Sequence, residues 1–384
     1  MPRTGLIRRI MLRLLTLGII FGAGVPILRS SPFPEFAPGG EVQIKLEHYP
    51  ESAVVFVPAD FQPKAAAGIT WPVLFYYPGT GGHPDVKFLR HLVDDKGWLL
   101  VGLPHQDPGR FAVTETSMDL ERSALRSALH FLREAFPIDP AKVVVGGFSK
   151  GGWLSGLLVD SMPELTGALI MGAGFYQNQE ERSFRQDLRS ASIFIGVGET
   201  DGNFAMSHGA GKKLERRGAS VTLEVWPGIG HQLPTDGQAE GLRQWLKLHA
   251  PDSGSLAMKS EALDWLDSEA VRIRQLAHPV EQWASLDRLG SLPYLTLADQ
   301  EFLKEARDLR QKIFQLPGIR EEEAATGDFE AIVAREGNDR FVETLQSCHQ
   351  AYLSLAKNRA GTLASKLAAT QAKRTETMLR AAGH

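Results

Sequence analysis

Residues 143–153 read Val-Val-Val-Gly-Gly-Phe-Ser-Lys-Gly-Gly-Trp. The three valines predict a strand, and the apolar spacing that begins near Trp153 predicts a helix. Ser149 thus stands at a sharp strand-to-helix turn, within the pattern Gly147-x-Ser149-x-Gly151. A serine at the apex of such a turn takes a strained backbone conformation, so small residues are needed two positions before and after it. The pattern predicts a nucleophilic Ser149, and a plain Gly/Ser loop is the alternative.

Strand and helix patterns alternate on both sides of this turn. Two short strands come first, at 41–47 and 53–57. Further strands are expected at 73–77, 98–103, 142–146, 165–171, 192–197 and 220–226, and helices at 86–94, 117–136, 153–161, 205–217 and 238–249. Continuous apolar strands that alternate with helices indicate a parallel sheet covered on both faces, here after an antiparallel start. The predicted fold class is therefore α/β.

Strand patterns stop near Pro251, and helical patterns continue to the end of the sequence. Helices are expected at 260–276, 297–314, 328–336, 340–357 and 362–381. No repeat period identifies this part of the chain. We therefore expect a catalytic domain at 41–250 and an all-helical C-terminal module of unknown role at 251–384.

The first 29 residues differ from all that follows. Arginines at positions 3, 8, 9 and 13 precede a mostly apolar stretch at 14–28, which has the proportions of a secretory signal peptide and is short for a membrane span. An uncleaved membrane anchor and a twin-arginine signal are the alternatives. Residues 30–40 are rich in Pro, Ser and Gly, as in a linker. We expect an exported protein that is periplasmic, secreted or anchored in the membrane through its N-terminus.

The composition of the chain argues against several classes of protein. The chain has 384 residues, of which 43% are hydrophobic and 23% charged, as is ordinary for a globular protein. A net charge of -3 argues against a nucleic-acid partner, because such proteins carry a basic surplus. Cys348 is the only cysteine, so neither an intramolecular disulfide nor a Cys/His zinc cluster can form. We therefore expect no metal site of this kind.

A serine nucleophile needs a histidine to take its proton and a carboxylate to orient that histidine. Asp201 follows the strand expected at 192–197, and His231 follows the strand expected at 220–226. Together with Ser149 they leave the same carboxyl edge of the sheet, where open α/β sheets bind ligands. Asp201 alone could be a turn residue and His231 a loop histidine, and Glu199 is a rival carboxylate. The order Ser, Asp, His at successive strand ends favours a catalytic triad.

The reaction also needs backbone N–H donors for a developing oxyanion. The amide of Lys150 is one candidate, and the amide of Thr80 or Gly81, in the Gly-rich loop after the strand at 73–77, is the other. A phosphate-binding loop is excluded because its motif, G-x-x-x-x-G-K-[ST], does not follow this strand. His83 and His105 lie in loops at the same edge and are candidates for lining the pocket, with a surface role as the alternative.

Residues 147–152, 198–201 and 230–231 resemble the α/β-hydrolase superfamily. Within it they are closest to the compact phospholipase/carboxylesterase, acyl-protein thioesterase and polyhydroxybutyrate-depolymerase or feruloyl-esterase-like enzymes. The resemblance covers residues 41–250 and implies an eight-stranded, mostly parallel sheet, cofactor-free hydrolysis and the triad Ser149, Asp201 and His231. Lys150 departs from the Gln, Ala or Met of many relatives, and the compact enzymes have no counterpart of the helical tail.

The predicted function is a serine esterase that cleaves a carboxylic ester or thioester on a small molecule or a polymer. A peptidase on the same fold is one alternative. A surface binding or scaffold protein, whose helical module recruits a protein partner, is another.

Overall fold

The computed structural model describes residues 36–61, 70–106, 114–175, 187–249, 252–290, 300–339 and 341–383. These residues belong to one compact unit, 35–384. The predicted export segment at 1–29 and the first residues of the expected linker lie outside the described residues. None of the helices within the described ranges is long and apolar enough to cross a membrane.

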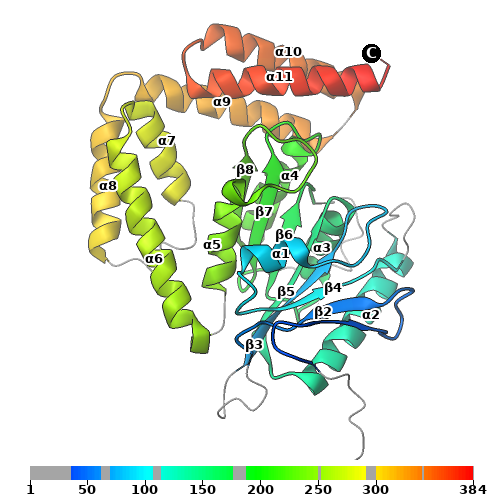
Figure 1. The fold of residues 1–384 in the computed structure, drawn as a ribbon. Helices are drawn as coiled ribbons and strands as arrows, with labels where there is room; N and C mark the ends of the chain where they lie inside the picture. Colours follow the sequence, from blue (N-terminus) through cyan, green and yellow to red (C-terminus); the bar gives the residue numbers. More distant parts are fainter. Residues whose placement is uncertain are drawn as a thin grey trace, which may run out of the picture. The chain divides into compact units, whose positions relative to one another are not determined.

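An eight-stranded sheet forms the centre of the fold (Figure 1). Its strands are β1 (Glu41–Ile44), β2 (Ala53–Phe56), β3 (Trp71–Tyr77), β4 (Leu99–Gly102), β5 (Ile138–Phe148), β6 (Gly167–Met171), β7 (Ser192–Gly198) and β8 (Ser220–Trp226), in the spatial order β1-β2-β4-β3-β5-β6-β7-β8. β2 pairs antiparallel with β1 and β4, and all other pairs are parallel. The predicted α/β class and mostly parallel sheet are confirmed.

The strand register brings the functional loops to one edge. Tyr77 pairs with Gly147, Phe148 with Met171, and Gly198 with Trp226. Since these strands are parallel, the loops that follow β3, β5, β7 and β8 all leave the sheet at its carboxyl edge.

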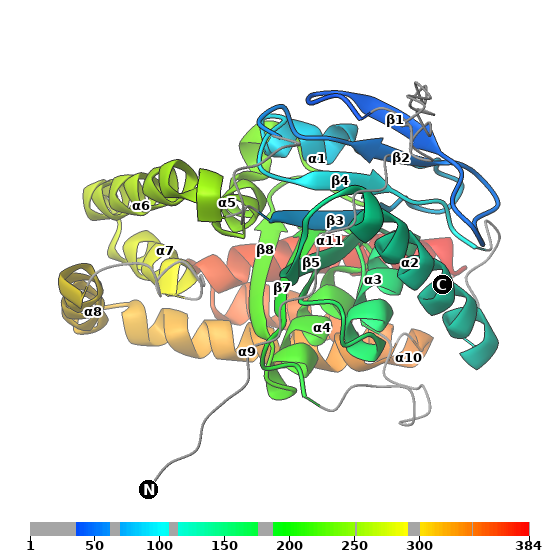
Figure 2. The ribbon, with the colours of Figure 1, turned by 90° about the horizontal axis from the view of Figure 1, so that it is seen from below.

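Five helices cover the two faces of the sheet: α1 (Lys87–Leu92), α2 (Glu115–Ala135), α3 (Lys150–Ser161), α4 (Phe204–Arg216) and α5 (Glu240–Leu248). Figure 2 shows α1 and α5 on one side and α2, α3 and α4 on the other. Every residue of β3, β4 and β6 is buried, because helices pack on both of their faces. Two apolar cores result, one under α2 and α3 around Leu129 and Leu157, and one under α1 and α5 around Leu89 and Trp245.

Six helices follow: α6 (Asp252–Gln275), α7 (Pro279–Gly290), α8 (Gln300–Phe314), α9 (Ile319–Asn338), α10 (Val342–Asn358) and α11 (Leu363–Ala381). The sequence analysis missed α7, because it treated Pro279 only as a helix breaker. Proline is in fact tolerated as the first residue of a helix, where its missing N–H has no partner to lose. The expected helix at 328–336 was too short, since α9 begins nine residues earlier. The division at residue 251 stays a prediction.

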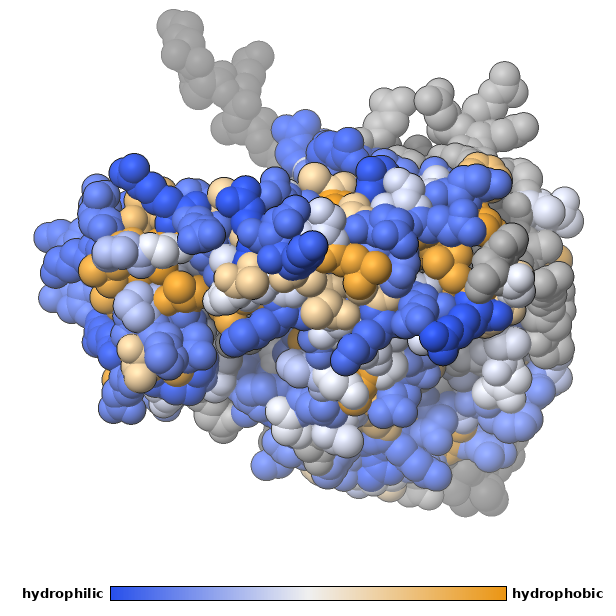
Figure 3. Space-filling model, turned by 90° about the horizontal axis from the view of Figure 1, so that it is seen from above, coloured by the Kyte–Doolittle hydropathy of each residue, from blue (hydrophilic) through white to orange (hydrophobic). Residues whose placement is uncertain are grey.

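These helices share apolar cores with the sheet. Trp283 of α7 belongs to the same core as Trp245 of α5, while Phe329 of α9 and Tyr352 of α10 pack in a third core with Phe204 of α4. Hydrophilic side chains cover most of the face that Figure 3 shows, with apolar side chains in narrow bands between them. The helices are thus amphipathic, and they turn their apolar sides inward.

Candidate active site

Ser149 occupies the turn between β5 and α3. Its backbone has φ 54° and ψ −115°, a conformation that is costly for a residue with a β-carbon. A β-carbon on Gly147 would overlap the backbone of Gly151, and one on Gly151 would overlap the carbonyl oxygen of Tyr77. The two glycines are therefore a steric requirement of the turn. The helix begins at Lys150, directly after the serine and three residues earlier than expected.

The structure brings Ser149, Asp201 and His231 together. His231 Nε2 lies 2.8 Å from Ser149 Oγ, and His231 Nδ1 lies 2.9 Å from Asp201 Oδ2. The imidazole also lies against the ring of Phe148, with 4.9 Å between the ring centroids. Neutral His231 can accept a proton from Ser149 through Nε2 while Nδ1–H donates to the carboxylate.

Asp201 is held on both of its carboxylate oxygens. Its side chain is 1% exposed, and its Oδ1 accepts a hydrogen bond of 2.7 Å from the Asn203 amide while Oδ2 faces His231. Asn203 in turn donates from Nδ2 to the carbonyl of Gly172 at 2.7 Å. The rival carboxylate of Glu199 instead accepts from the Gly228 amide at 3.0 Å. The geometry therefore selects Asp201 over Glu199 as the partner of His231.

The loop after β3 lies beside the serine. A β-carbon on Gly79 would come within 3.6 Å of Ser149 Cβ. The loop turns back on itself, because the Gly82 amide donates to the Gly79 carbonyl at 3.0 Å and Gly81 has φ 74°. Thr80 and Gly81 are exposed in this loop, and Lys150 begins α3 on the other side of the serine. These are the positions expected to supply the oxyanion donors.

Residues 109–249 match the family model of the Dienelactone hydrolase family. This part of the chain is thus similar to that family, and the sheet and helices described above have the arrangement of the α/β-hydrolase fold. Similar solved structures include a Bacillus cereus carboxylesterase, with 23% identity and a TM-score of 0.39 over 47% of this chain and 89% of that one. A Dyadobacter fermentans phospholipase/carboxylesterase has 15% identity and a TM-score of 0.37, covering 44% of this chain and 88% of its own. Arabidopsis thaliana SOBER1 has 15% identity and a TM-score of 0.39, covering 47% and 99%. No curated protein matches the chain.

The two histidines expected to line the pocket of this α/β-hydrolase differ in their surroundings. His105 is 5% exposed, and its Nε2 lies 2.8 Å from the Pro78 carbonyl, so it supports the loop of Gly79 and Thr80 from behind. The His83 side chain is 84% exposed and lies 3.4 Å from the Glu51 carboxylate. His105 is therefore placed in the wall under the loop, and His83 on the surface.

A second histidine–serine pair lies at the other end of the parallel strands. His249 Nε2 is 2.9 Å from Ser192 Oγ, but His249 Nδ1 bonds to the Trp245 carbonyl and not to a carboxylate. Ser192 begins β7, at the edge of the sheet opposite to Ser149. This pair lacks the third member of a triad, and we assign it a structural role. Within the described ranges no cluster of His, Cys, Asp and Glu could hold a metal ion.

Helix α11 reaches the loop that carries the acid. Gln371 Nε2 donates to the Glu199 carbonyl at 2.8 Å. Gln371 also accepts from Arg374 Nε at 2.5 Å, and Arg374 forms a buried bidentate pair with Glu336 of α9 at 2.6 Å. The helices therefore contribute a buried polar chain that ends two residues before Asp201.

Sequence reasoning missed three residues of the site. The contact of Asp201 with the Asn203 backbone amide could have been found, because an Asp in a turn commonly accepts from the backbone N–H two residues on. Phe148 was visible next to the serine, but nothing in the sequence indicates that its ring lies against His231. Gln371 lies in an ordinary helical pattern, and no local signal connects it to Glu199.

Proposed function

We propose that this α/β-hydrolase is a serine hydrolase that cleaves a carboxylic ester or thioester through an acyl-enzyme. The observation that carries the proposal is the continuous path from Ser149 Oγ through His231 to Asp201, with atoms 2.8 and 2.9 Å apart. The strained backbone of Ser149 supports it further, because strain at this turn aims the hydroxyl away from the sheet.

The geometry supports a two-step reaction. His231 Nε2 takes the proton of Ser149 as Oγ attacks the substrate carbonyl, and the amides of Lys150 and of Thr80 or Gly81 stabilise the oxyanion. The imidazolium then gives its proton to the leaving alcohol or thiol as the carbon–oxygen or carbon–sulfur bond breaks. Water, deprotonated by His231, attacks the carbonyl carbon of the acyl-enzyme. The imidazolium then returns this proton to Ser149 Oγ as the bond between Oγ and the acyl carbon breaks and the acid leaves. Asp201 stays ionised and orients the imidazole throughout.

Labelling with a fluorophosphonate probe tests the nucleophile. Wild type should be labelled and Ser149→Ala should not, because the probe reacts with an activated serine. Ser161→Ala is a matched control from α3, since Ser161 bonds only to carbonyls of its own helix. Labelling of Ser149→Ala at the wild-type level would show that the assignment is wrong.

Substrate class needs a separate comparison. We expect p-nitrophenyl esters to be cleaved much faster than p-nitroanilide peptides. The reverse order would indicate a peptidase on the same fold. A screen of acyl chain length and of polymer-borne esters would then define the acyl group.

Export through the N-terminal segment is likewise a proposal. It is supported by the arginines and the apolar stretch within residues 1–29. Sequencing the N-terminus of the protein recovered from each cell fraction tests it, because an export signal predicts that the mature chain begins after this segment.

A further inference from the structure

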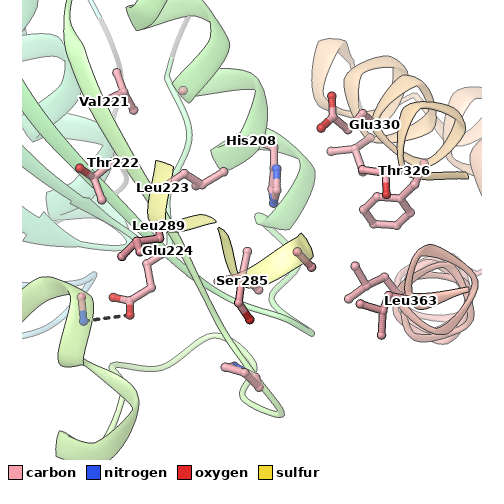
Figure 4. A pocket seen from close by; sticks show the side chains of 18 of the residues that line it. His208, Val221, Thr222, Leu223, Glu224, Ser285, Leu289, Thr326, Glu330 and Leu363 are labelled. Carbon is pink, nitrogen blue, oxygen red and sulfur yellow. Dashed lines mark hydrogen bonds between the residues drawn. The ribbon is translucent and has the colours of Figure 1, made fainter. Parts of the chain in front are cut away.

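β8 is the outer strand of the sheet, and its open side faces a cavity. The cavity has a volume of about 950 Å³ and lies between β8, α4 and the helices α6, α7, α9 and α11. Figure 4 shows Val221, Thr222 and Glu224 on one side, with Thr326 and Glu330 of α9 and Leu363 of α11 across from them. The volume is at the upper end of the range of small-molecule sites.

The backbone of β8 presents hydrogen-bonding groups to this cavity. The Ser220 amide donates to the Ala191 carbonyl at 3.0 Å, and the Trp226 carbonyl accepts from the Glu199 amide at 2.9 Å, so even-numbered residues face β7. Because successive residues of a strand alternate, the N–H and C=O groups of Val221, Leu223 and Val225 point outward. No strand within the described ranges pairs with them.

Nothing in β8 blocks this edge. Natural proteins protect an edge strand with lysine, proline or a bulge, but residues 220–226 read Ser-Val-Thr-Leu-Glu-Val-Trp and pair with β7 in an unbroken register. Two buried polar atoms of residues that line the cavity, Thr222 Oγ1 and His208 Nε2, also have no hydrogen-bond partner in the part of the chain that the structure describes. Burial lowers the pKa of His208 to about 4, so its imidazole stays neutral at pH 7.

The side chains that line the cavity indicate what kind of ligand it can bind. Trp265, Trp283, Phe329 and Val333 make them largely apolar. The ionisable side chains are predominantly acidic: Glu215, Glu224, Glu240, Glu269, Glu322 and Glu330 outnumber Lys212 and Arg272. Both basic residues already pair with carboxylates of the cavity, at 3.1 and 2.8 Å. Glu224 and Glu322 accept hydrogen bonds from backbone amides, and Glu240 pairs with Arg243, but the carboxylates still outnumber the basic groups around the cavity, so its potential is acidic.

We propose that this cavity binds an extended peptide of a partner protein, with alternating apolar and basic side chains, as a ninth strand beside β8. The main chain of the peptide would pair with Val221, Leu223 and Val225, and its side chains would enter the apolar and acidic walls. A purely apolar ligand would leave the outward backbone groups unpaired, at a cost of about 1–3 kcal/mol for each buried group. The site is distinct from Ser149, so the proposal does not depend on esterase activity.

A synthetic peptide tests the strand pairing without altering the protein. The probe is fluorescein-labelled Val-Lys-Val-Lys-Val-Lys amide, and its polarisation is measured with the full chain. N-methylation at alternate residues gives two isomers, of which only one blocks the N–H groups that would face β8. We expect that isomer to bind at least about tenfold more weakly than the other. Equal binding of the two isomers, or no saturable binding up to about 1 mM, would overturn the proposal.

Variants test the location of the site. Leu223→Pro removes one outward N–H, which an edge strand tolerates, while Leu223→Ala keeps that N–H and serves as the matched control. Proline should weaken peptide binding about tenfold relative to alanine.

The charge of the cavity is tested separately. Glu215→Lys should also weaken peptide binding, and a Val-Glu-Val-Glu-Val-Glu probe should not bind. Thermal melting followed by circular dichroism reports whether each variant is folded. Unchanged peptide affinity in folded Leu223→Pro would contradict the proposal. It would also be contradicted if the cavity bound an apolar dye but not the peptide.

Discussion

Ser149 carries the local strain of the active site, and its replacement separates stability from activity. Glycine accepts positive φ without the steric cost that a β-carbon imposes. Ser149→Gly should therefore unfold with a free energy about 1 kcal/mol higher than Ser149→Ala, although both variants lose activity. Urea denaturation of the two variants measures the difference. If the alanine variant were equally stable, the φ of 54° would not be a source of strain.

His249 makes the stability of the fold depend on pH. Burial lowers its pKa from 6.5 to about 4 in the folded protein. Between these two values the unfolded chain binds more protons, so stability is present above pH 6.5 and is lost as the pH falls toward 4. One such group gives a slope of at most about 1.4 kcal/mol per pH unit. His249→Gln should flatten this slope in urea melts at several pH values; an unchanged slope would exclude His249 as a cause.

The residues of the site could largely be predicted because each follows a strand with a clear pattern. Asp201 and His231 come after β7, which is largely apolar, and β8, in which polar and apolar residues alternate, and both strands end in loops. Strand ends at one edge of a parallel sheet place distant residues together, so the proximity follows from topology. The choice between Asp201 and Glu199 could not be predicted, because it depends on side-chain directions within a loop.

At the scale of elements, helices α9 and α4 come into close contact at Gly337 of α9. A β-carbon on Gly337 would overlap the Ala205 carbonyl, whereas one on Gly327, in the exposed middle of α9, would meet nothing within 4 Å. Gly337→Ala should therefore lower the free energy of unfolding by about 1–3 kcal/mol. Gly327→Ala should raise it by up to about 1 kcal/mol, because alanine is the better helix former. Thermal melts of the pair test the contact, which would be absent if both variants gained stability.

The elements of the α/β region were easier to predict than the helices beyond it. The buried strand β6 shows itself as a continuous apolar run, and the alternating pattern at 220–226 matches the edge strand β8 at both ends. The start of α9 carries charged residues from Arg320 to Glu323, so its apolar pattern becomes clear only later in the helix. Its true extent depends on packing against α4 and α10, which the local sequence does not specify.

For the whole molecule, the contact of Gln371 with the Glu199 carbonyl links the helical region to the acid loop. Gln371→Leu keeps a side chain of similar size but removes the donor. We expect kcat to fall about tenfold or more with little change in KM, because the Asp201 loop is held less firmly. The acid limb of the pH–rate profile should move to lower pH, since a weaker carboxylate contact stabilises the imidazolium of His231 less.

Thr370→Ala is the matched control for this prediction, because the Thr370 hydroxyl bonds only within α11. A Gln371→Leu variant with lower melting temperature but unchanged kcat and pH profile would show that the contact is merely structural. No sequence pattern predicts this contact, since the two residues are 172 positions apart and Gln371 lies in an ordinary helical pattern.

The distance in sequence between Glu199 and Gln371 also has a consequence for biosynthesis. At synthesis rates of about 5–20 residues per second, Gln371 is made roughly 10–30 s after Glu199. His231 also follows Glu199 in the sequence, so Ser149, Asp201 and His231 are all present only in the later part of this interval, while the acid loop still lacks its tie to α11. The contact between Gln371 and Glu199 can therefore form only once nearly the whole chain has been made.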